Sequence, residues 1–526
     1  MKQQKEARPR VIEAKDVGKL IKDGDTVTPC GVGGTMVSDI TLASIEASFL
    51  ATGHPRDLTL VYPCPFGHPE GDGLDRFAHE GLLRRVIGSS YHSGYVQPKL
   101  CALVRENRIE GYVLPLGVFY KLIRDISAGL PGTFSYVGLG TIIDPRYGGG
   151  RLNEMTKEDI VELVNVQGRE MLFYKGFPID VAIIHGTTAD EDGNISLEEE
   201  PLTLEPLHQA MAAHNRGGIV ICQVRRLAAR GSLNPRTVEV PGILVDYIVV
   251  DPNQRQQTHL PGYDPAISGE IRIPEPPIKL QPLDEEKVIC RRALMQLAPN
   301  IVLNLGAGLP NRRVALVARE EGVAQQIHIS VEHGALGGLN LSGSAHVNPT
   351  SLLTACDIMD LYHGGGLDWS FLGFMEVDRL GNVNLGRLGN TIEGPGGCID
   401  ISASTPKVAF LSTFTYGGLK VEVGGGKLRI ITEGKTRKFV KNVQGIFYNS
   451  EYGKQKGQQI RYITERAVFE LRDEGIALIE VAPGIDLEKD VLGQMEFRPT
   501  IATDLKEMSP DIFREPYLGI VERYWE

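Results

Sequence analysis

Long hydrophobic runs are absent from the 526-residue sequence. Its most apolar segment, residues 242–250, is short and is interrupted by Asp246, whereas a membrane-spanning helix needs roughly 18 or more apolar residues. The amino-terminal residues MKQQKEARPR are charged and contain no apolar core, so we expect no secretory signal. The sequence therefore predicts a protein that stays in solution, with the cytoplasm as its expected location.

Excess positive charge and paired cysteines are also missing. The chain has 55 basic and 66 acidic residues, and the net charge of -11 argues against general nucleic-acid binding. Its seven cysteines are widely separated and form no CxxC pair, which excludes a disulfide framework and favours a reducing compartment. An anionic ligand stays compatible with this composition, because a few basic side chains and helix amino-termini are enough to bind one.

Three common catalytic and nucleotide-binding motifs are not completed anywhere. No glycine run gives GxGxxG at a junction between strand and helix, which argues against a nucleotide-dependent oxidoreductase. The segment VEVGGGK fails GxxxxGK because Val421 occupies the first glycine position. A serine hydrolase of the GxSxG type is likewise not indicated.

A carboxylate followed by glycines is the most informative local pattern. Residues 327–331 alternate apolar and polar side chains, as is typical of a half-buried strand, and the strand pattern ends on Glu332. Gly334, Gly337 and Gly338 follow, and glycine permits close approaches that a Cβ would block. The pattern predicts a strand that delivers a carboxylate to an accessible loop, although a solvated Glu at a strand end also fits it.

The two halves of the chain resemble each other. Residues 178–197 align without gaps with residues 366–385, which pairs Asp180 with Asp368 and Asp190 with Asp378. Three further pairs of segments keep the same order: the glycine turns at Gly31 and Gly306, LTLVYP (58–63) with IHISVE (327–332), and GGIVICQV (217–224) with PKVAFLST (406–413). A coherent order favours duplication, so we predict an α/β fold of two similar domains with the site at their interface.

The repeat is chemically asymmetric, because it places Pro63 where the second half has Glu332. Only the second domain then carries the carboxylate, and the first contributes walls and hydrogen-bond donors. Residues 252–284 are rich in proline and lack apolar periodicity, which is typical of a connection. We therefore expect domains over residues 1–251 and 285–526, joined by a linker over residues 252–284.

The expected local structure alternates strands, glycine turns and helices. Patterns of apolar residues and breakers predict helices over residues 11–24, 36–50, 79–91 and 115–129, and strands over residues 25–30 and 58–63. Residues 138–151 are expected to be irregular, residues 415–445 to form hairpins, and residues 486–501 to form a final helix with an extended tail.

The loop SVEHGALGG (330–338) resembles that of the family I coenzyme A transferases, in which a Glu-[Asn/His]-Gly sequence carries the nucleophilic glutamate. Further matches follow in family order: TVTPCGVGG (26–34), PLGVFYKLIRDISAG (115–129), GLGTIIDPRYGGGRLN (138–153), GTTADEDGN (186–194), LNLGAGLP (303–310), EVDRLGNVNL (376–385), GPGGCIDIS (394–402) and IEVAPGIDL (479–487). The chain is most similar to the single-chain acetate, propionate and acetoacetate CoA-transferases, in which the two halves are fused.

The resemblance implies that Glu332 attacks an acyl-CoA thioester and passes through an acyl-glutamyl anhydride and a glutamyl-CoA thioester, with ping-pong kinetics. Acyl-CoA and small carboxylic acids would be the partners, CoA would be a substrate rather than a cofactor, no metal would be needed, and a homodimer or homotetramer is expected. Two alternatives stay open: an acyl-CoA hydrolase that uses the same glutamate, and a CoA-binding protein with weakened activity.

The resemblance also implies roles for several glycine loops. Backbone N–H groups in such loops can stabilise the oxyanion of each tetrahedral intermediate. The glycines that match family loops near the acyl group are Gly31, Gly33, Gly34, Gly396 and Gly397. Gly306 and Gly308 are expected to bind CoA at the start of a helix.

Three segments depart from the family pattern: the turn of residues 30–34, the loop around Cys64 and Phe66, and the position of Leu116. Many members have Pro-Gln-Gly where this chain has Pro-Leu-Gly, so Leu116 replaces a glutamine near the acyl group. A leucine cannot hydrogen-bond, which predicts a more apolar pocket and an altered acid. His333 either orients Glu332 or points away from it, whereas His185 and His363 are expected to be hydrogen-bonded structural residues.

Overall fold

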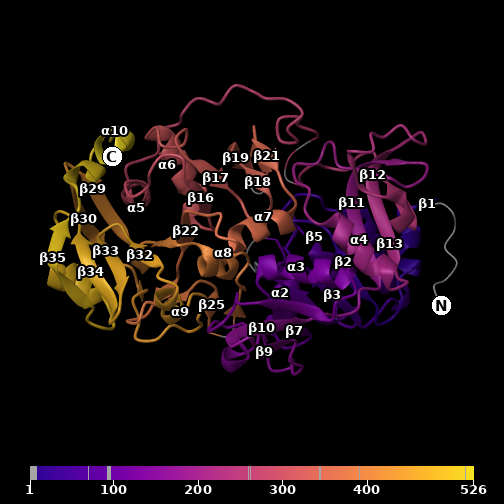
Figure 1. Cartoon of the computed structure of the whole chain (residues 1–526), viewed down its shortest axis with the longest axis horizontal. Helices are drawn as coiled ribbons and strands as arrows, with labels where there is room; N and C mark the ends of the chain where they lie inside the picture. Colours follow the sequence, from indigo (N-terminus) through magenta and orange to yellow (C-terminus); the bar gives the residue numbers. More distant parts are fainter. Residues whose placement is uncertain are drawn as a thin grey trace.

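The computed structural model describes residues 9–525 apart from residues 69, 92–95, 259, 261, 343, 344, 390 and 516. Two halves lie side by side, with the amino-terminal half in indigo and magenta and the carboxyl-terminal half in orange and yellow (Figure 1). Their helices are α1 (Asp39–Thr52), α2 (Pro98–Arg105), α3 (Leu116–Ser127), α4 (Pro206–Asn215), α5 (Glu285–Leu294), α6 (Ala315–Glu320), α7 (Ala355–His363), α8 (Cys398–Ser404), α9 (Ser450–Gln455) and α10 (Ile520–Tyr524).

A mainly parallel sheet forms the centre of the first half. Its strand order is β1 (Arg10–Ile12), β15 (Tyr247–Val250), β13 (Ile219–Ala228), β11 (Val181–Asp190), β2 (Thr26–Pro29), β3 (Leu58–Tyr62), β6 (Leu83–Gly88), β7 (Glu110–Val113). All residues of β11 are buried, as expected for a central strand covered on both faces. A separate antiparallel sheet contains β8 (Gly132–Ser135), β10 (Arg169–Lys175) and β9 (Val161–Val166).

The second half is built around a mixed sheet. Its order is β21 (Ser351–Leu352), β18 (Ala335–Leu336), β17 (His328–Ser330), β16 (Val302–Leu305), β22 (Trp369–Gly373), β27 (Lys407–Leu411), β32 (Gln459–Ile463), β33 (Ala467–Arg472), β34 (Gly475–Val481), β35 (Thr500–Glu507). Strands β17, β16, β22, β27 and β32 are parallel neighbours. The carboxyl ends of these strands therefore lie along one edge of the sheet.

The expected duplication is visible in the order of the strands. The first sheet contains β13-β11-β2-β3 and the second contains β27-β22-β16-β17 at the corresponding positions. The Asp180 carboxylate accepts a hydrogen bond from the Thr26 N–H at 2.9 Å, and the Asp368 carboxylate accepts one from the Val302 N–H at 2.8 Å. The same aspartate therefore ties the same pair of strands together in both halves, and the predicted α/β fold of two similar domains is confirmed.

A second pair of aspartates repeats in atomic detail. Asp190 accepts hydrogen bonds from the backbone N–H and side-chain amide of Asn194, at 2.9 and 3.0 Å. Asp378 accepts the same two bonds from Asn382, also at 2.9 and 3.0 Å. Each aspartate closes a turn between two antiparallel strands, β11 and β12 (Ile195–Ser196) in the first half and β23 (Glu376–Val377) and β24 (Val383–Asn384) in the second. The gapless alignment of the two segments therefore reflects equivalent structure.

Strand register also places the nucleophile candidate relative to the first half. Thr26 pairs with Thr59 between β2 and β3, and Val302 pairs with His328 between β16 and β17. Because Thr26 and Val302 occupy equivalent positions, Thr59 corresponds to His328, and four residues later Pro63 corresponds to Glu332. The predicted asymmetry of the repeat therefore holds in the structure.

Several local predictions are confirmed, and two are wrong. Helix α3 matches the amphipathic pattern, and β28 (Thr415–Tyr416), β29 (Lys420–Gly424), β30 (Lys427–Thr432) and β31 (Thr436–Arg437) form the expected hairpins. Residues 11–24 instead give the end of β1 and the short helix η1 (Ala14–Lys19). Residues 79–91 contain strand β6, because sheet pairing with β3 and β7 overrides a local pattern that also fits a helix.

The two halves share part of their hydrophobic core. One buried cluster combines Cys64, Leu116 and Tyr120 of the first half with Val331 and Met359 of the second. Helix α3 packs on α7 and α8 across this boundary. The halves are thus joined through side chains that lie directly under the Glu332 turn.

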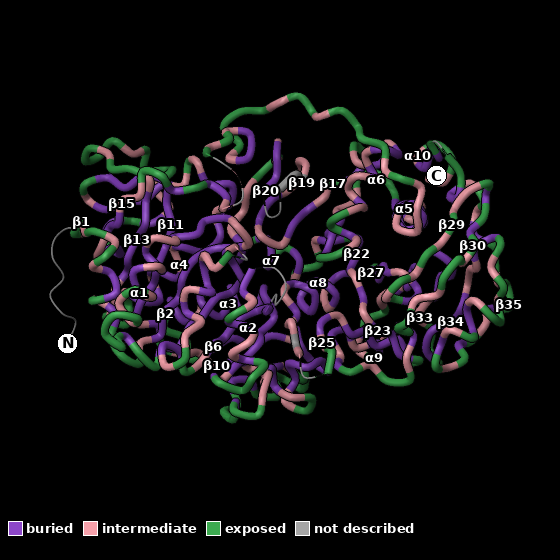
Figure 2. Tube along the Cα trace, turned by 180° about the vertical axis from the view of Figure 1, so that it is seen from behind, coloured by how far each residue is buried: buried purple, intermediate pink, exposed green. Residues whose placement is uncertain are grey.

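The segment between β15 and α5 crosses from one half to the other. Residues 270–281 are mostly exposed, and the trace runs along the top of the molecule (Figure 2). Among the residues that the structure describes, no helix combines the length and hydrophobicity that a bilayer-spanning segment requires.

The repeated aspartate turn gives a stability prediction. Asp378 is 6% exposed, so Asp378→Ala leaves donors of Leu380 and Asn382 without their acceptor. We expect a loss of about 1–3 kcal/mol in unfolding free energy, measured by denaturant titration. The matched control is Asp473→Ala, which removes an exposed carboxylate with no side-chain hydrogen bond to any described residue. Equal stability of the two variants would contradict the role of the turn.

Candidate active site

A cavity of about 530 Å³ lies at the carboxyl edge of the second sheet, where it meets the first half. The loops that follow β17, β16, β22 and β27 all line it, which is where parallel sheets usually hold ligands. The residues that line it include Cys64, Ser89, Ser90, Leu116, Glu286, Gly306, Gly308, Arg312, Glu332, His333, Phe374, Gly396, Gly397, Cys398, Ile401, Ser412, Thr413, Tyr416 and Lys438. The cavity thus collects side chains from both halves.

Glu332 lies two residues after the end of β17, at the second position of a tight turn. The turn is closed by the Gly334 N–H, which donates to the Val331 carbonyl at 3.1 Å. Gly334 has a φ of 112°, and a Cβ there would lie 2.1 Å from the Leu353 carbonyl oxygen, so the position requires glycine. The Oε2 atom of Glu332 is buried and has no hydrogen-bond partner among the described residues.

His333 lies on the same cavity as Glu332. Both side chains line it, because the turn breaks the alternation that would send neighbouring residues to opposite faces. Burial lowers the pKa of His333, and the negative charge of Glu332 only partly opposes this effect. The imidazole is therefore neutral near pH 7, and its Nδ1 atom is buried without a partner among the described residues.

The glycine pair before α8 stands next to the nucleophile candidate. A Cβ on Gly397 would lie 3.4 Å from Cγ of Glu332. The Gly396 N–H already donates to the Ser89 carbonyl at 3.0 Å. The Gly397 N–H donates to no residue that the structure describes, so within this glycine pair only Gly397 has a free N–H.

Leu116 lies at the first turn of α3, across the cavity. Its N–H donates to the Gly396 carbonyl at 3.0 Å, and its side chain is 1% exposed. Leu116, the residue predicted to shape the pocket, therefore lines the cavity beside Gly396 and Gly397. This backbone hydrogen bond joins the amino-termini of one helix from each half.

Asp400 makes a second contact between the amino-termini of α3 and α8. Its Oδ1 atom accepts hydrogen bonds from the Val118 N–H at 3.1 Å and from Nε2 of His363 at 3.0 Å. The aspartate is completely buried, and Gly117 leaves room for it, because a Cβ there would lie 2.9 Å from Oδ1. The prediction that His363 is a hydrogen-bonded structural residue fits this arrangement.

The amino-terminal glycine loop does not line the cavity as predicted. The Gly33 N–H donates to the Pro65 carbonyl at 2.9 Å, and the Gly34 carbonyl accepts from the Thr258 N–H at 2.8 Å. The space beside Gly31 is filled by the Phe66 ring, 2.6 Å from where a Cβ would lie. Gly31, Gly33 and Gly34 therefore lie behind the wall and support residues 63–66, which bring Cys64 to the cavity.

Gly306 and Gly308 line the cavity at the start of the next helical segment, η5 (Pro310–Val314), which continues into α6. The Gly306 N–H is held by the Phe371 carbonyl at 2.8 Å. Gly308 has a φ of 88° and open space around it, and its N–H donates to no described residue. The loop is thus placed one strand away from Glu332, with a free donor facing the cavity.

Sequence reasoning missed part of the first-half wall. Ser89 and Ser90 follow β6 and line the cavity, and the Ser89 hydroxyl is buried without a partner among the described residues. They were hidden because residues 79–91 fit a helical pattern. Recognising a strand there would have placed both serines at a strand end, the usual location of binding residues.

The buried thiols at the cavity are unreactive lining groups. Burial raises the pKa of Cys64 well above its usual value, and the nearby Glu332 charge raises it further. Burial also raises the pKa of Cys398, with Asp400 and Glu332 acting in the same direction. Both side chains therefore stay protonated and behave as small apolar groups.

Comparison with known proteins points to one family. The model of the family described as coenzyme A transferase matches residues 12–251. A caffeate CoA-transferase of Acetobacterium woodii is 41% identical, covering 97% of this chain and 98% of that protein. An acetate CoA-transferase, YdiF, of Escherichia coli K12 is 38% identical, covering 98% of this chain and 97% of that protein.

A solved structure agrees with these relatives. The apoenzyme of the acyl-CoA transferase YdiF from Escherichia coli O157:H7 superposes with a TM-score of 0.94 at 37% identity, covering 99% of each chain. A thioester complex of the same transferase with CoA gives a TM-score of 0.92, also at 37% identity and 99% coverage of each chain.

Proposed function

The chain belongs to the coenzyme A transferase family and is an acyl-CoA:carboxylate CoA-transferase, and we propose that it works through covalent intermediates on Glu332. The observation that carries this proposal is the Glu332 carboxylate, which faces the cavity with a buried oxygen that has no hydrogen-bond partner among the described residues. An unpaired carboxylate is available as a nucleophile, whereas a structural one would be neutralised by donors.

The reaction begins when a Glu332 oxygen attacks the thioester carbonyl of acyl-CoA. The bond between carbon and sulfur breaks, which gives an acyl-glutamyl anhydride and the CoA thiolate. The thiolate then attacks the glutamyl carbonyl, releasing the first acid as its carboxylate and leaving a glutamyl-CoA thioester. A second acid reverses these steps and leaves as the new acyl-CoA, so ping-pong kinetics are expected. The solved thioester complex of the transferase YdiF with CoA supports this route.

The Gly397 N–H is proposed to stabilise the oxyanion that each addition creates. It is free, it lies beside Glu332, and it begins α8. Removing one such donor typically costs about 3–4 kcal/mol in the barrier. Gly396 contributes differently, since its N–H and carbonyl both bond to the first half and hold the loop in place.

The acyl end of the cavity favours an acid whose only charge is its reacting carboxylate. Next to Glu332 and Gly397 it is lined by Cys64, Leu116, Cys398 and Ile401. No cationic side chain of the described residues lies at this end, so a second carboxylate on the acid would be buried without a counter-charge. We propose a monocarboxylic substrate with an apolar body, a class that includes the acids named for the acetate and caffeate transferases.

Glu332→Ala tests the nucleophile. We expect transfer to fall by roughly three orders of magnitude or more, because no other group can carry the acyl or CoA moiety. Peptide mass analysis after incubation with acetyl-CoA should show a CoA adduct on the peptide containing Glu332, discharged by added carboxylate and missing from the variant. An adduct on another peptide would overturn the assignment, and thioester consumption without any added carboxylate would indicate a hydrolase.

Leu116→Gln tests the acyl pocket. A glutamine side chain would supply a hydrogen bond inside the cavity, so the preference for hydroxy or keto acids over plain acids should rise about tenfold in kcat/KM. The control is Leu130→Gln, which changes an exposed leucine beyond the end of α3. An unchanged ratio in a panel of acids would show that Leu116 does not contact the acid.

Asp400 is expected to be a positioning residue. Asp400→Ala removes the acceptor for Val118 and His363, and kcat should fall about tenfold or more as the joint between α3 and α8 loosens. Asp400→Asn keeps an oxygen in the same place and should retain most of the activity. Equal losses in both variants, with KM rising instead of kcat falling, would argue against positioning.

A further inference from the structure

Lys438 lines the cavity at the end opposite the acyl pocket. It follows β31, which pairs with β28, and it is 8% exposed. Its Nζ atom donates to the hydroxyls of Ser412 and Thr413, the two residues that follow β27. A lysine ammonium is rarely buried unless it is paired, so its surroundings need an explanation.

The charge of Lys438 has no matching carboxylate within the described residues. Its ammonium lies 5.8 Å from the Phe374 ring centroid and 5.7 Å from that of Tyr416. Burial lowers its pKa to about 8, and the negative charge of Glu465 only partly opposes that effect. A desolvated cation between two aromatic rings, open to a cavity, is poised to receive an anion.

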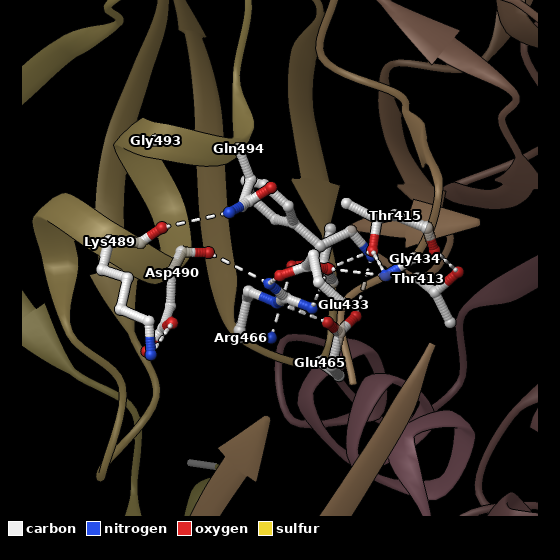
Figure 3. Close-up of polar contacts among 12 residues, drawn as sticks. Thr413, Thr415, Glu433, Gly434, Glu465, Arg466, Lys489, Asp490, Gly493 and Gln494 are labelled. Atoms are coloured by element: carbon white, nitrogen blue, oxygen red, sulfur yellow. Dashed lines mark hydrogen bonds and ion pairs between the residues drawn. The ribbon is translucent and has the colours of Figure 1, made fainter. Parts of the chain in front are cut away.

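A buried polar network fixes the loop that carries the partners of Lys438 (Figure 3). Arg466 is completely buried, and it donates to Glu465 and Glu433, each at 2.7 Å. Glu465 in turn accepts from the Phe414 N–H at 2.9 Å, and Glu433 accepts from the Thr415 hydroxyl. Arg466 is the ion-pair partner of Glu465. The network therefore orients residues 412–416 without supplying a carboxylate that pairs with Lys438.

Strand spacing sets how far this cation lies from the reacting centre. The order β17-β16-β22-β27 puts three strand intervals between the strand ends that precede Glu332 and Ser412, or roughly 14 Å. The pantetheine arm of CoA spans a separation of this order between its thiol and its diphosphate. The loop at Gly306 and Gly308 follows β16, only one strand interval from β17. This shorter distance fits a contact with the pantetheine arm rather than with the phosphates.

We propose that Lys438 binds the diphosphate of CoA, while the thiol end reacts at Glu332 and the arm crosses the loops after β16 and β22. The proposal rests on the proposed function, because it places the CoA thioester at Glu332. Arg312, the other cationic residue among those lining the cavity, is 63% exposed and already paired with Glu286. A bound phosphate would therefore stabilise the charge of Lys438 more than that of Arg312.

Binding to a variant that cannot react tests the contact separately from the chemistry. In a Glu332→Ala background, calorimetry with free CoA should show Lys438→Met weakening binding about 10- to 100-fold, the range for a lost hydrogen bond to a charged group. Lys435→Met is the matched control, since Lys435 is an exposed lysine on the same hairpin. An unchanged affinity in Lys438→Met would overturn the proposal, whatever the activity of Glu332.

Truncated substrates identify the group that is bound. With otherwise unaltered enzyme, Lys438→Met should lower kcat/KM about 10- to 100-fold for acetyl-CoA and for acetyl-dephospho-CoA, because both carry the diphosphate. It should leave S-acetylpantetheine, which has no phosphate, unaffected. Equal losses with all three substrates would place Lys438 against the arm, and a loss confined to acetyl-CoA would assign it to the 3′-phosphate; either result contradicts the diphosphate assignment.

The pH dependence provides an independent signature. Deprotonation removes the cation, so kcat/KM for acetyl-CoA should fall as the pH rises through about 8. The titratable groups that face Lys438 are Glu465 and Tyr416. Lys438→Arg should keep the affinity and lose the inflection. An inflection near pH 8 that persists in this variant would belong to another group and contradict the assignment.

Discussion

The contact between the amino-termini of α3 and α8 is the interaction on which the site depends. The Leu116 N–H donates a hydrogen bond to the Gly396 carbonyl, and the Val118 N–H donates one to the Asp400 carboxylate. These bonds hold the amino-terminus of a helix from one half against that of a helix from the other. Two helix amino-termini bring two positive dipole ends toward the same small volume. That volume is where negative charge would develop as Glu332 attacks, and neither half alone could create it.

Duplication explains why the two halves fit together, and loss of symmetry explains what each one does. Equivalent aspartates close equivalent turns in both halves, but the loop after β17 carries Glu332 where the loop after β3 carries Pro63. In the first half, the corresponding loop forms part of the cavity wall and contributes Cys64 to its lining. A pair of identical carboxylates facing one cavity would repel each other, so the asymmetry leaves a single carboxylate at this pair of equivalent positions.

Much of this arrangement could be predicted from the sequence, because it depends on local patterns. Glycines after a strand end and the paired aspartates are encoded by neighbouring residues, and these predicted the repeat and the Glu332 turn. Residues 79–91 show where such reasoning fails: their apolar spacing fits a helix, and only pairing with distant strands makes β6. The role of Gly33 was beyond sequence reasoning for the same reason, since its N–H is taken by Pro65, a partner 32 residues away. Lys438 gave no local signal either, because its burial depends on rings contributed by Phe374 and Tyr416.

The covalent connection between the halves has a consequence for how the enzyme is assembled. Because both halves line the cavity, two separate chains would form a site only at concentrations above their mutual dissociation constant. The covalent connection makes that encounter intramolecular, so it no longer depends on the concentration of the protein. Translation of one chain also fixes the ratio of the two halves at one to one, and dilution cannot separate them.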